Sequence, residues 1–183
     1  MKKQFIRLFL LIFPFITSGQ SIFEKLQNNK NVTYINITPK MFQMLGSMAV
    51  SSNDPESTYL KEIINEIKSF NVLITSSNDI ITQITKWVES TSKKEDIDQI
   101  FSISEEKIEM NIYAKDVKET GGLKTILIFS KGLSIKQINS KNNAKKIEAF
   151  LLLVEGNISL ENISKLIEKM NLPGRDQLQK AGI

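Results

Sequence analysis

The sequence predicts an α+β fold: a mixed sheet with a C-terminal antiparallel meander of about four strands, and amphipathic helices packed mainly on one face. Two observations support this prediction. An apolar strand, a Ser, Thr or Asn cap and an amphipathic helix follow one another three times, in residues 34–45, 71–87 and 151–167. From Asp98 onward apolar and polar residues instead alternate, which is the pattern of strands with one covered face.

The first twenty residues have the layout of a secretory signal peptide. They begin with a positive segment, continue with an apolar run over residues 5–16 and end with small polar residues. The run is shorter than the roughly 20 apolar residues that a bilayer-spanning helix needs. We therefore expect cleavage near Gly19 or Gln20, with an uncleaved anchor as the alternative. Residues 21–183 are then expected to form a single exported α+β domain, in the periplasm or secreted.

The N-terminal half is predicted to alternate between helices and short strands. Thr38 followed by Pro39 suits the start of a helix, because the hydroxyl can cap free amides and proline at the first helical position gives up no needed donor. Residues 58–70 place five apolar side chains at helical spacing opposite charged ones. The predicted elements are a short helix from Ser21, a strand Val32–Ile37, a helix from Pro39 to about Met48, a helix over 58–70, a strand over 72–75 and a helix after the polar residues 76–79.

The C-terminal half is predicted to form the meander. Residues 98–104 and 108–117 should pair as a hairpin, and a further strand follows Gly121 and Gly122. The lysine-rich residues 134–146 are expected to form a loop or a ragged strand end. Residues 148–156 are apolar on both faces, which places this strand centrally in the sheet. Ser159 is expected to cap the last good helix, which Pro173 and Gly174 end.

Composition excludes several classes of function. The chain has no cysteine and no histidine, so disulfides, Cys or His zinc sites and histidine-dependent triads are unavailable. Of its 24 basic residues, three lie in the signal segment, which leaves 21 against 20 acidic residues. A nucleic-acid partner is therefore not expected, because such proteins keep a clear basic excess.

Carboxylates offer the remaining catalytic alternative, a hydrolase that uses a carboxylate pair. They occur at turns or strand ends, where solvated charge is the ordinary explanation. The candidates are Glu105 with Glu106, Asp116 with Glu119, and Glu155. We expect no catalytic residue, no cofactor and no resident metal.

A partner-contact face is the preferred interpretation of the methionine-rich helix. Met41, Met44 and Met48 lie on adjacent turns and form an apolar face that is either buried or free for a partner. Copper(I) is the alternative, because thioethers are soft ligands. Asn111 and Tyr113 share the polar face of a predicted strand and are the second candidate for this contact.

The lysine-rich segment is a candidate for membrane contact. Lys136, Lys141, Lys145 and Lys146 could approach anionic lipid or an acidic partner. A solvated loop is the alternative interpretation of the same residues.

The order of features also resembles a known family. The segments that carry the likeness are GQS, IFEKLQNNKNVTYINITPKMFQML, VLITSS and GNISLENISKLIEKM, the last with Gly156, Ile158, Leu160, Ile163 and Leu166. Together they are similar to an exported Bacteroidota domain-of-unknown-function family, number 4252, over essentially the whole mature chain. The resemblance implies an envelope protein of unassigned activity with no catalytic residues to transfer. It also suggests a link to extracytoplasmic sigma-factor regulation.

The expected function is therefore non-catalytic binding, or a structural role, in the bacterial envelope. The partner would be an envelope protein or an apolar ligand held between helices and sheet. The alternatives are a regulator linked to envelope stress or an extracytoplasmic sigma factor, and the carboxylate-based hydrolase.

Overall fold

A computed structural model describes residues 21–49, 63, 65–116, 122–137, 145–173 and 175–180. The expected signal segment, residues 1–20, lies outside this range. Within it, no helix combines the length and the apolar character that crossing a membrane would require.

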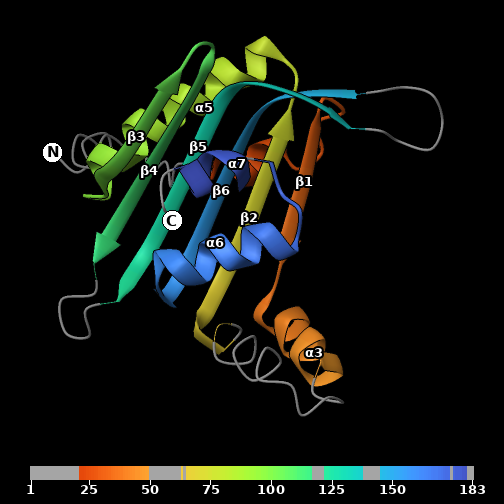
Figure 1. Cartoon of the computed structure of the whole chain (residues 1–183), viewed down its shortest axis with the longest axis vertical. Helices are drawn as coiled ribbons and strands as arrows, with labels where there is room; N and C mark the ends of the chain where they lie inside the picture. Colours follow the sequence, from red (N-terminus) through yellow and green to blue (C-terminus); the bar gives the residue numbers. More distant parts are fainter. Residues whose placement is uncertain are drawn as a thin grey trace, which may run out of the picture.

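The described strands form one six-stranded sheet in the order β1-β2-β6-β5-β4-β3 (Figure 1). Every neighbouring pair is antiparallel, so the sheet is not mixed as predicted. It also has six strands rather than four. Strands β3 to β6 are neighbours in chain order, and β2 and then β1 lie on the other side of β6. The strands are β1 (Val32–Ile37), β2 (Ile67–Thr75), β3 (Asp98–Glu105), β4 (Ile108–Asp116), β5 (Leu123–Gln137) and β6 (Lys145–Ile158).

Alternation along the central strands creates two separate apolar cores. In β6, Phe150 and Leu152 belong to the core on one face, and Leu151 belongs to the core on the other. This confirms the central position predicted for a strand that is apolar on both sides, since β6 lies between β2 and β5.

Helices consequently cover both faces, which corrects the expectation that they pack mainly on one. The core with Phe150 includes side chains of α3, α6 and α7, and the core with Leu151 includes side chains of α2 and α5. A sheet that is apolar on both faces cannot be covered from one side. We call these the α6 face and the α5 face. The helices are α2 (Ile22–Leu26), α3 (Pro39–Ala49), α5 (Asn78–Lys94), α6 (Leu160–Lys169) and α7 (Arg175–Lys180).

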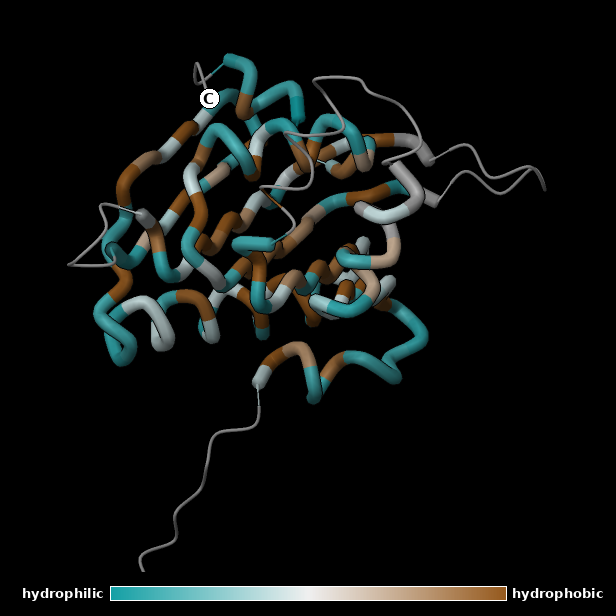
Figure 2. Tube along the Cα trace, turned by 90° about the horizontal axis from the view of Figure 1, so that it is seen from below, coloured by the Kyte–Doolittle hydropathy of each residue, from teal (hydrophilic) through white to brown (hydrophobic). Residues whose placement is uncertain are grey.

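Figures 1 and 2 show this layering from two sides. In Figure 1, α6 and α7 lie in front of the sheet and α5 behind it. Seen from below, hydrophobic strand segments cross the middle of the molecule (Figure 2). The core therefore consists of two apolar layers that share the central strands.

Two predicted helix starts are confirmed. The amide of Met41 donates to Oγ1 of Thr38 (3.3 Å), and α3 begins at Pro39. The amide of Asn162 donates to Oγ of Ser159 (3.1 Å) at the start of α6. Each hydroxyl satisfies an amide that has no partner inside its helix.

The helix predicted over residues 58–70 does not continue to Phe70. Residues 63, 65 and 66 are helical, but β2 begins at Ile67, and the remaining residues of the prediction lie outside the described range. The pairing of β2 with β6 shifts between Ile67 and Ser69. This bulge places Ile67 and Phe70 in the same core although three positions separate them, a spacing that imitates a helix.

The segment 134–146 is also more regular than predicted. β5 continues to Gln137 and β6 starts at Lys145, so only residues 138–144 lie outside the description. The register between β5 and β6 shifts between Lys131 and Ile135. Gly132 lies in this bulge with φ +76°, a backbone conformation that favours glycine.

Candidate functional site

A groove of about 780 Å³ lies on the α6 face, between the sheet and the link that joins α6 to α7. Strand residues form its floor, and the link with the first residues of α7 forms its wall. In Figure 1, α7 lies in front of the central strands of the sheet. We call this feature the apolar groove.

The lining of the apolar groove is mainly aliphatic. Its apolar side chains come from β1, β2, β4, β5, β6 and the α6–α7 link. They are Ile35, Ile74, Ile108, Leu133, Ile135, Ile147, Met170, Leu172 and Pro173. Most are buried or half-buried, but Ile135 keeps 39% of its surface exposed. A large side chain of this kind in a concave surface is a typical contact for an apolar ligand.

Three polar residues of α7 stand beside this apolar lining. Gln177 is only 9% exposed, yet its amide makes no hydrogen bond to any residue that the structure describes. Arg175 and Asp176 are exposed and form an ion pair at 3.3 Å. The amide atoms of Gln177 still reach solvent, because among the described residues Ser130 Oγ is the side-chain atom that is fully buried without a partner. The groove therefore offers a donor and acceptor that a bound molecule could satisfy.

Local backbone features explain how the groove is built. Asn171 follows α6 with φ 50°, and the amide of Leu172 donates to the carbonyl oxygen of Ile167 at 3.0 Å. This is the Schellman arrangement, which ends the helix and turns the chain toward the sheet. On the opposite side, the bulge at Gly132 brings Leu133 into the core of the α6 face. The groove thus depends on one helix end and one strand irregularity.

The predicted methionine face is exposed where the structure describes it. Met41 and Met44 are 49% and 58% exposed, whereas Phe42 is buried against Phe70 with ring centroids 5.8 Å apart. The side chain of Met48 lies outside the described residues. Met41 and Met44 are therefore not core residues, and both the partner contact and the copper(I) alternative stay predictions.

Asn111 and Tyr113 lie on the other face of the sheet from Phe42. Tyr113 packs against the core of the α5 face, and burial, followed by Glu89 and Glu109, raises the pKa of its phenol. Asn111 donates to Oε1 of Glu109 at 3.2 Å. Three strands separate β4 from β1, and α3 packs on the α6 face. The structure therefore does not bring the two predicted contact regions together.

Glu109 on β4 forms an ion pair with a lysine of the neighbouring strand. Its Oε2 lies 2.9 Å from Nζ of Lys131 on β5. The hydrogen bond from Lys131 lowers the pKa of Glu109, the charge of that lysine and the hydrogen bond from Asn111 lower it further, and burial opposes them. The side chain of Asn111 is therefore already engaged in a hydrogen bond within the protein.

The candidate carboxylates of the hydrolase alternative are dispersed. Glu105 accepts from Lys180 at 2.6 Å beside the β3–β4 turn that contains Glu106. Glu155 lies near the other end of the sheet, where β6 pairs with Thr125. Asp116 ends β4, and Glu119 lies outside the described residues. Among the described residues, no group of three or more acidic side chains could hold a metal ion.

The lysines proposed for membrane contact can be described only in part. Lys136 and Lys146 are partners across β5 and β6, and Lys146 pairs with Glu148 at 2.8 Å. Lys141 and the side chains of Lys136 and Lys145 lie outside the described residues. Membrane contact stays a prediction.

Sequence reasoning missed the groove residues. Ile135 lay in a segment predicted to be a loop, and Gln177 lies beyond Pro173 and Gly174, where the last predicted helix ends. Neither carries a local motif, because the groove arises where segments distant in sequence meet.

Comparison with known proteins places the chain in a family. The family model described as "Domain of unknown function (DUF4252)" matches residues 23–166, and the chain belongs to this family. The match covers the whole sheet and most of α6. No curated protein and no solved structure matches the chain.

Proposed function

We propose that this chain is a non-catalytic binding domain of the bacterial envelope, and that the apolar groove is its binding site. The observation that carries the proposal is the combination of an aliphatic groove with the amide of Gln177, which lines the groove and makes no hydrogen bond to any described residue. The signal-like residues 1–20 support the location, since they have the layout of a segment that directs export.

The groove favours a ligand with an apolar body and a polar head. Its volume of about 780 Å³ lies within the range of roughly 300–1,000 Å³ that is usual for small-molecule sites. Aliphatic walls contribute by removing apolar ligand surface from water. The amide of Gln177 and the guanidinium of Arg175 can receive the head group. A fatty-acid chain has both properties.

Calorimetric titration with laurate, kept below its micellar concentration, tests the proposal on residues 21–183. We expect saturable binding that Ile135→Asp weakens more than tenfold, because a charge would then face the apolar walls. Gln177→Leu should weaken binding less, since it removes only the polar anchor. Ile100→Asp is the matched control, because Ile100 is also exposed, at 46%, but lies on β3 outside the groove.

Two results would contradict the proposal. The first is the absence of saturable heat when laurate is added to the folded protein, and the second is an equal loss of binding in Ile135→Asp and Ile100→Asp. Circular dichroism of each variant confirms that the fold is retained before affinities are compared.

A further inference from the structure

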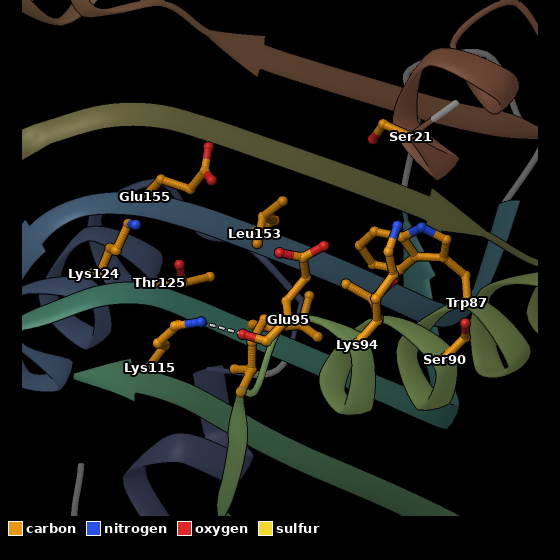
Figure 3. Close-up of a pocket in the computed structure, with 13 residues that line it drawn as sticks. Ser21, Trp87, Ser90, Lys94, Glu95, Lys115, Lys124, Thr125, Leu153 and Glu155 are labelled. Atoms are coloured by element: carbon orange, nitrogen blue, oxygen red, sulfur yellow. Dashed lines mark hydrogen bonds between the residues drawn. The ribbon is translucent and has the colours of Figure 1, made fainter. Parts of the chain in front are cut away.

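A second concave site lies on the α5 face, away from the apolar groove. This cleft of about 420 Å³ opens between the C-terminal turns of α5 and strands β4, β5 and β6. Thr125, Leu127 and Leu153 form its floor, and Trp87 belongs to its wall (Figure 3). We call it the charged cleft.

The charged cleft takes its name from five ionisable side chains that come from four different elements. Lys94 and Glu95 belong to the end of α5, Lys115 to β4, Lys124 to β5 and Glu155 to β6. Three ammonium groups thus stand against two carboxylates. Among the residues that the structure describes, no ion pair joins any of these lysines to either carboxylate. The net positive charge is therefore available to an anion.

Part of this charge is already positioned by the protein. Nζ of Lys115 donates to the backbone oxygen of Glu95, at the C-terminal end of α5 (Figure 3). Cations are favourable at this end of a helix, so the contact fixes the ammonium group at the edge of the cleft. Its other two N–H groups remain for a ligand.

Glu155 is held from the opposite side by a chain of hydrogen bonds. Oγ of Ser69 donates to Oε2 of Glu155 at 3.0 Å and accepts from Nδ2 of Asn71 at 3.2 Å. Oδ1 of Asn71 in turn accepts from Tyr34 at 2.9 Å and from Asn36 at 2.6 Å. This chain crosses β1, β2 and β6 and orients one carboxylate before any ligand binds.

The floor also carries a hydroxyl that a ligand could reach. Thr125 is only 8% exposed, and its hydroxyl makes no hydrogen bond to any described residue. Figure 3 shows this hydroxyl on the side of the floor where Leu153 and Glu155 lie. Among the described residues, Ser130 Oγ is the side-chain atom that is fully buried without a partner, so the hydroxyl of Thr125 still reaches the solvent of the cleft and can donate to or accept from a ligand.

We propose that the charged cleft binds an anionic sugar. The lysines would receive the carboxylate or phosphate of the ligand, and Glu155 and the Thr125 hydroxyl would receive its hydroxyl groups. Trp87 offers an apolar surface with a polar edge, which suits a sugar ring. The proposal is independent of the one made for the apolar groove, because the two sites lie on opposite faces of the sheet.

Titration calorimetry tests this proposal with glucuronate, glucose 6-phosphate, glucose and inorganic phosphate, each on residues 21–183. We expect one or both anionic sugars to bind at least tenfold more tightly than glucose and inorganic phosphate. Their affinity should fall as salt is added, because charge contributes to the contact. Comparing the affinities of the two anionic sugars shows whether the lysines prefer a carboxylate or a phosphate.

Variants locate the binding and separate it from folding. Lys124→Gln should weaken the anionic sugar about tenfold, as expected for a hydrogen bond to a charged group. Thr125→Val should weaken it severalfold without lowering stability, because the hydroxyl has no partner to lose. Lys86→Gln is the matched control, since Lys86 is exposed on α5 but does not line the cleft.

Three outcomes would overturn the proposal. They are no binding of either anionic sugar at 20 mM, binding of inorganic phosphate as tight as that of the sugars, or equal affinities in Lys124→Gln and Lys86→Gln. A loss of laurate binding in the groove variants would leave this result unaffected.

Discussion

Gly156 on β6 lies directly against the backbone of Glu66, so that a Cβ at position 156 would stand 2.1 Å from the Glu66 carbonyl oxygen. This contact occurs where the chain enters β2, and Ile67 is the strand partner of Gly156. The absence of a side chain at position 156 therefore allows the helical residues before β2 to join the sheet. The close approach of two backbones is a characteristic role of glycine in a strand.

Gly156→Ala should lower the free energy of unfolding by about 1–3 kcal/mol, the usual cost of overpacking. The methyl group meets backbone atoms, which cannot rotate away as a side chain could. Urea denaturation measures the change. Ser104→Ala, at an exposed position of β3, is the control and should change stability little. Equal stability of the two variants would contradict the contact.

The end of α5 provides a stabilising prediction. Asp96 has φ 56°, and the amide of Ile97 donates to the carbonyl oxygen of Ser92 at 2.8 Å, as in a Schellman cap. Asp96→Gly should raise the free energy of unfolding by up to about 1 kcal/mol, because glycine adopts this conformation without steric cost. Asp96→Ala keeps the Cβ and should give no gain. Thermal denaturation distinguishes them, and a glycine variant no more stable than the alanine variant would refute the explanation.

The sequence predicted those features of the fold that depend on local patterns. The caps at Thr38 and Ser159 require only neighbouring residues, and each hydroxyl binds the predicted helix. The central position of β6 followed from an apolar run without alternation. These predictions succeeded because the chemistry that determines them lies within a few residues.

Features that depend on distant contacts were not predictable in this way. Ile67 and Phe70 show helical spacing, and only the pairing of β2 with β6 reveals the bulge that places them in one core. Helices on both faces follow from how the layers assemble. Gln177 and Thr125 have no local motif, and their lack of hydrogen-bond partners among the described residues becomes visible only in the packed chain.

Glu109 predicts a dependence of stability on pH. Its pKa is lowered in the folded protein from an ordinary value of 4.5, chiefly by the hydrogen bond from Lys131. The unfolded chain therefore takes up the proton first, so this contribution is complete above the unfolded pKa and is lost as the pH falls through the folded pKa. The stability difference between wild type and Glu109→Gln should accordingly be largest at neutral pH and shrink in acid.

Urea denaturation at several pH values measures the effect of Glu109. In a Lys131→Met background, Glu109→Gln should change the pH dependence of the free energy of unfolding much less, because the lysine that lowers the pKa of Glu109 is absent. A wild-type advantage that stays constant down to strongly acidic pH would show that the ion pair does not stabilise the fold.

Ser130 on β5 carries a fully buried hydroxyl that has no hydrogen-bond partner among the described residues. It faces Met110 on β4 and Phe150 on β6, which both belong to the apolar core of the α6 face. Ser130→Ala should therefore raise the free energy of unfolding by about 1 kcal/mol, because the substitution removes an unsatisfied polar group. Urea denaturation at neutral pH measures the gain.

Ser69→Ala is the matched comparison for Ser130→Ala. The hydroxyl of Ser69 donates to Glu155 and accepts from Asn71, so its removal breaks two hydrogen bonds. This variant should lose about 1 kcal/mol of stability. Opposite signs for the two serines would show that the pairing of a hydroxyl, and not its presence, decides its contribution to this sheet. A loss of stability in Ser130→Ala would instead indicate that the hydroxyl at position 130 has a partner in the folded chain.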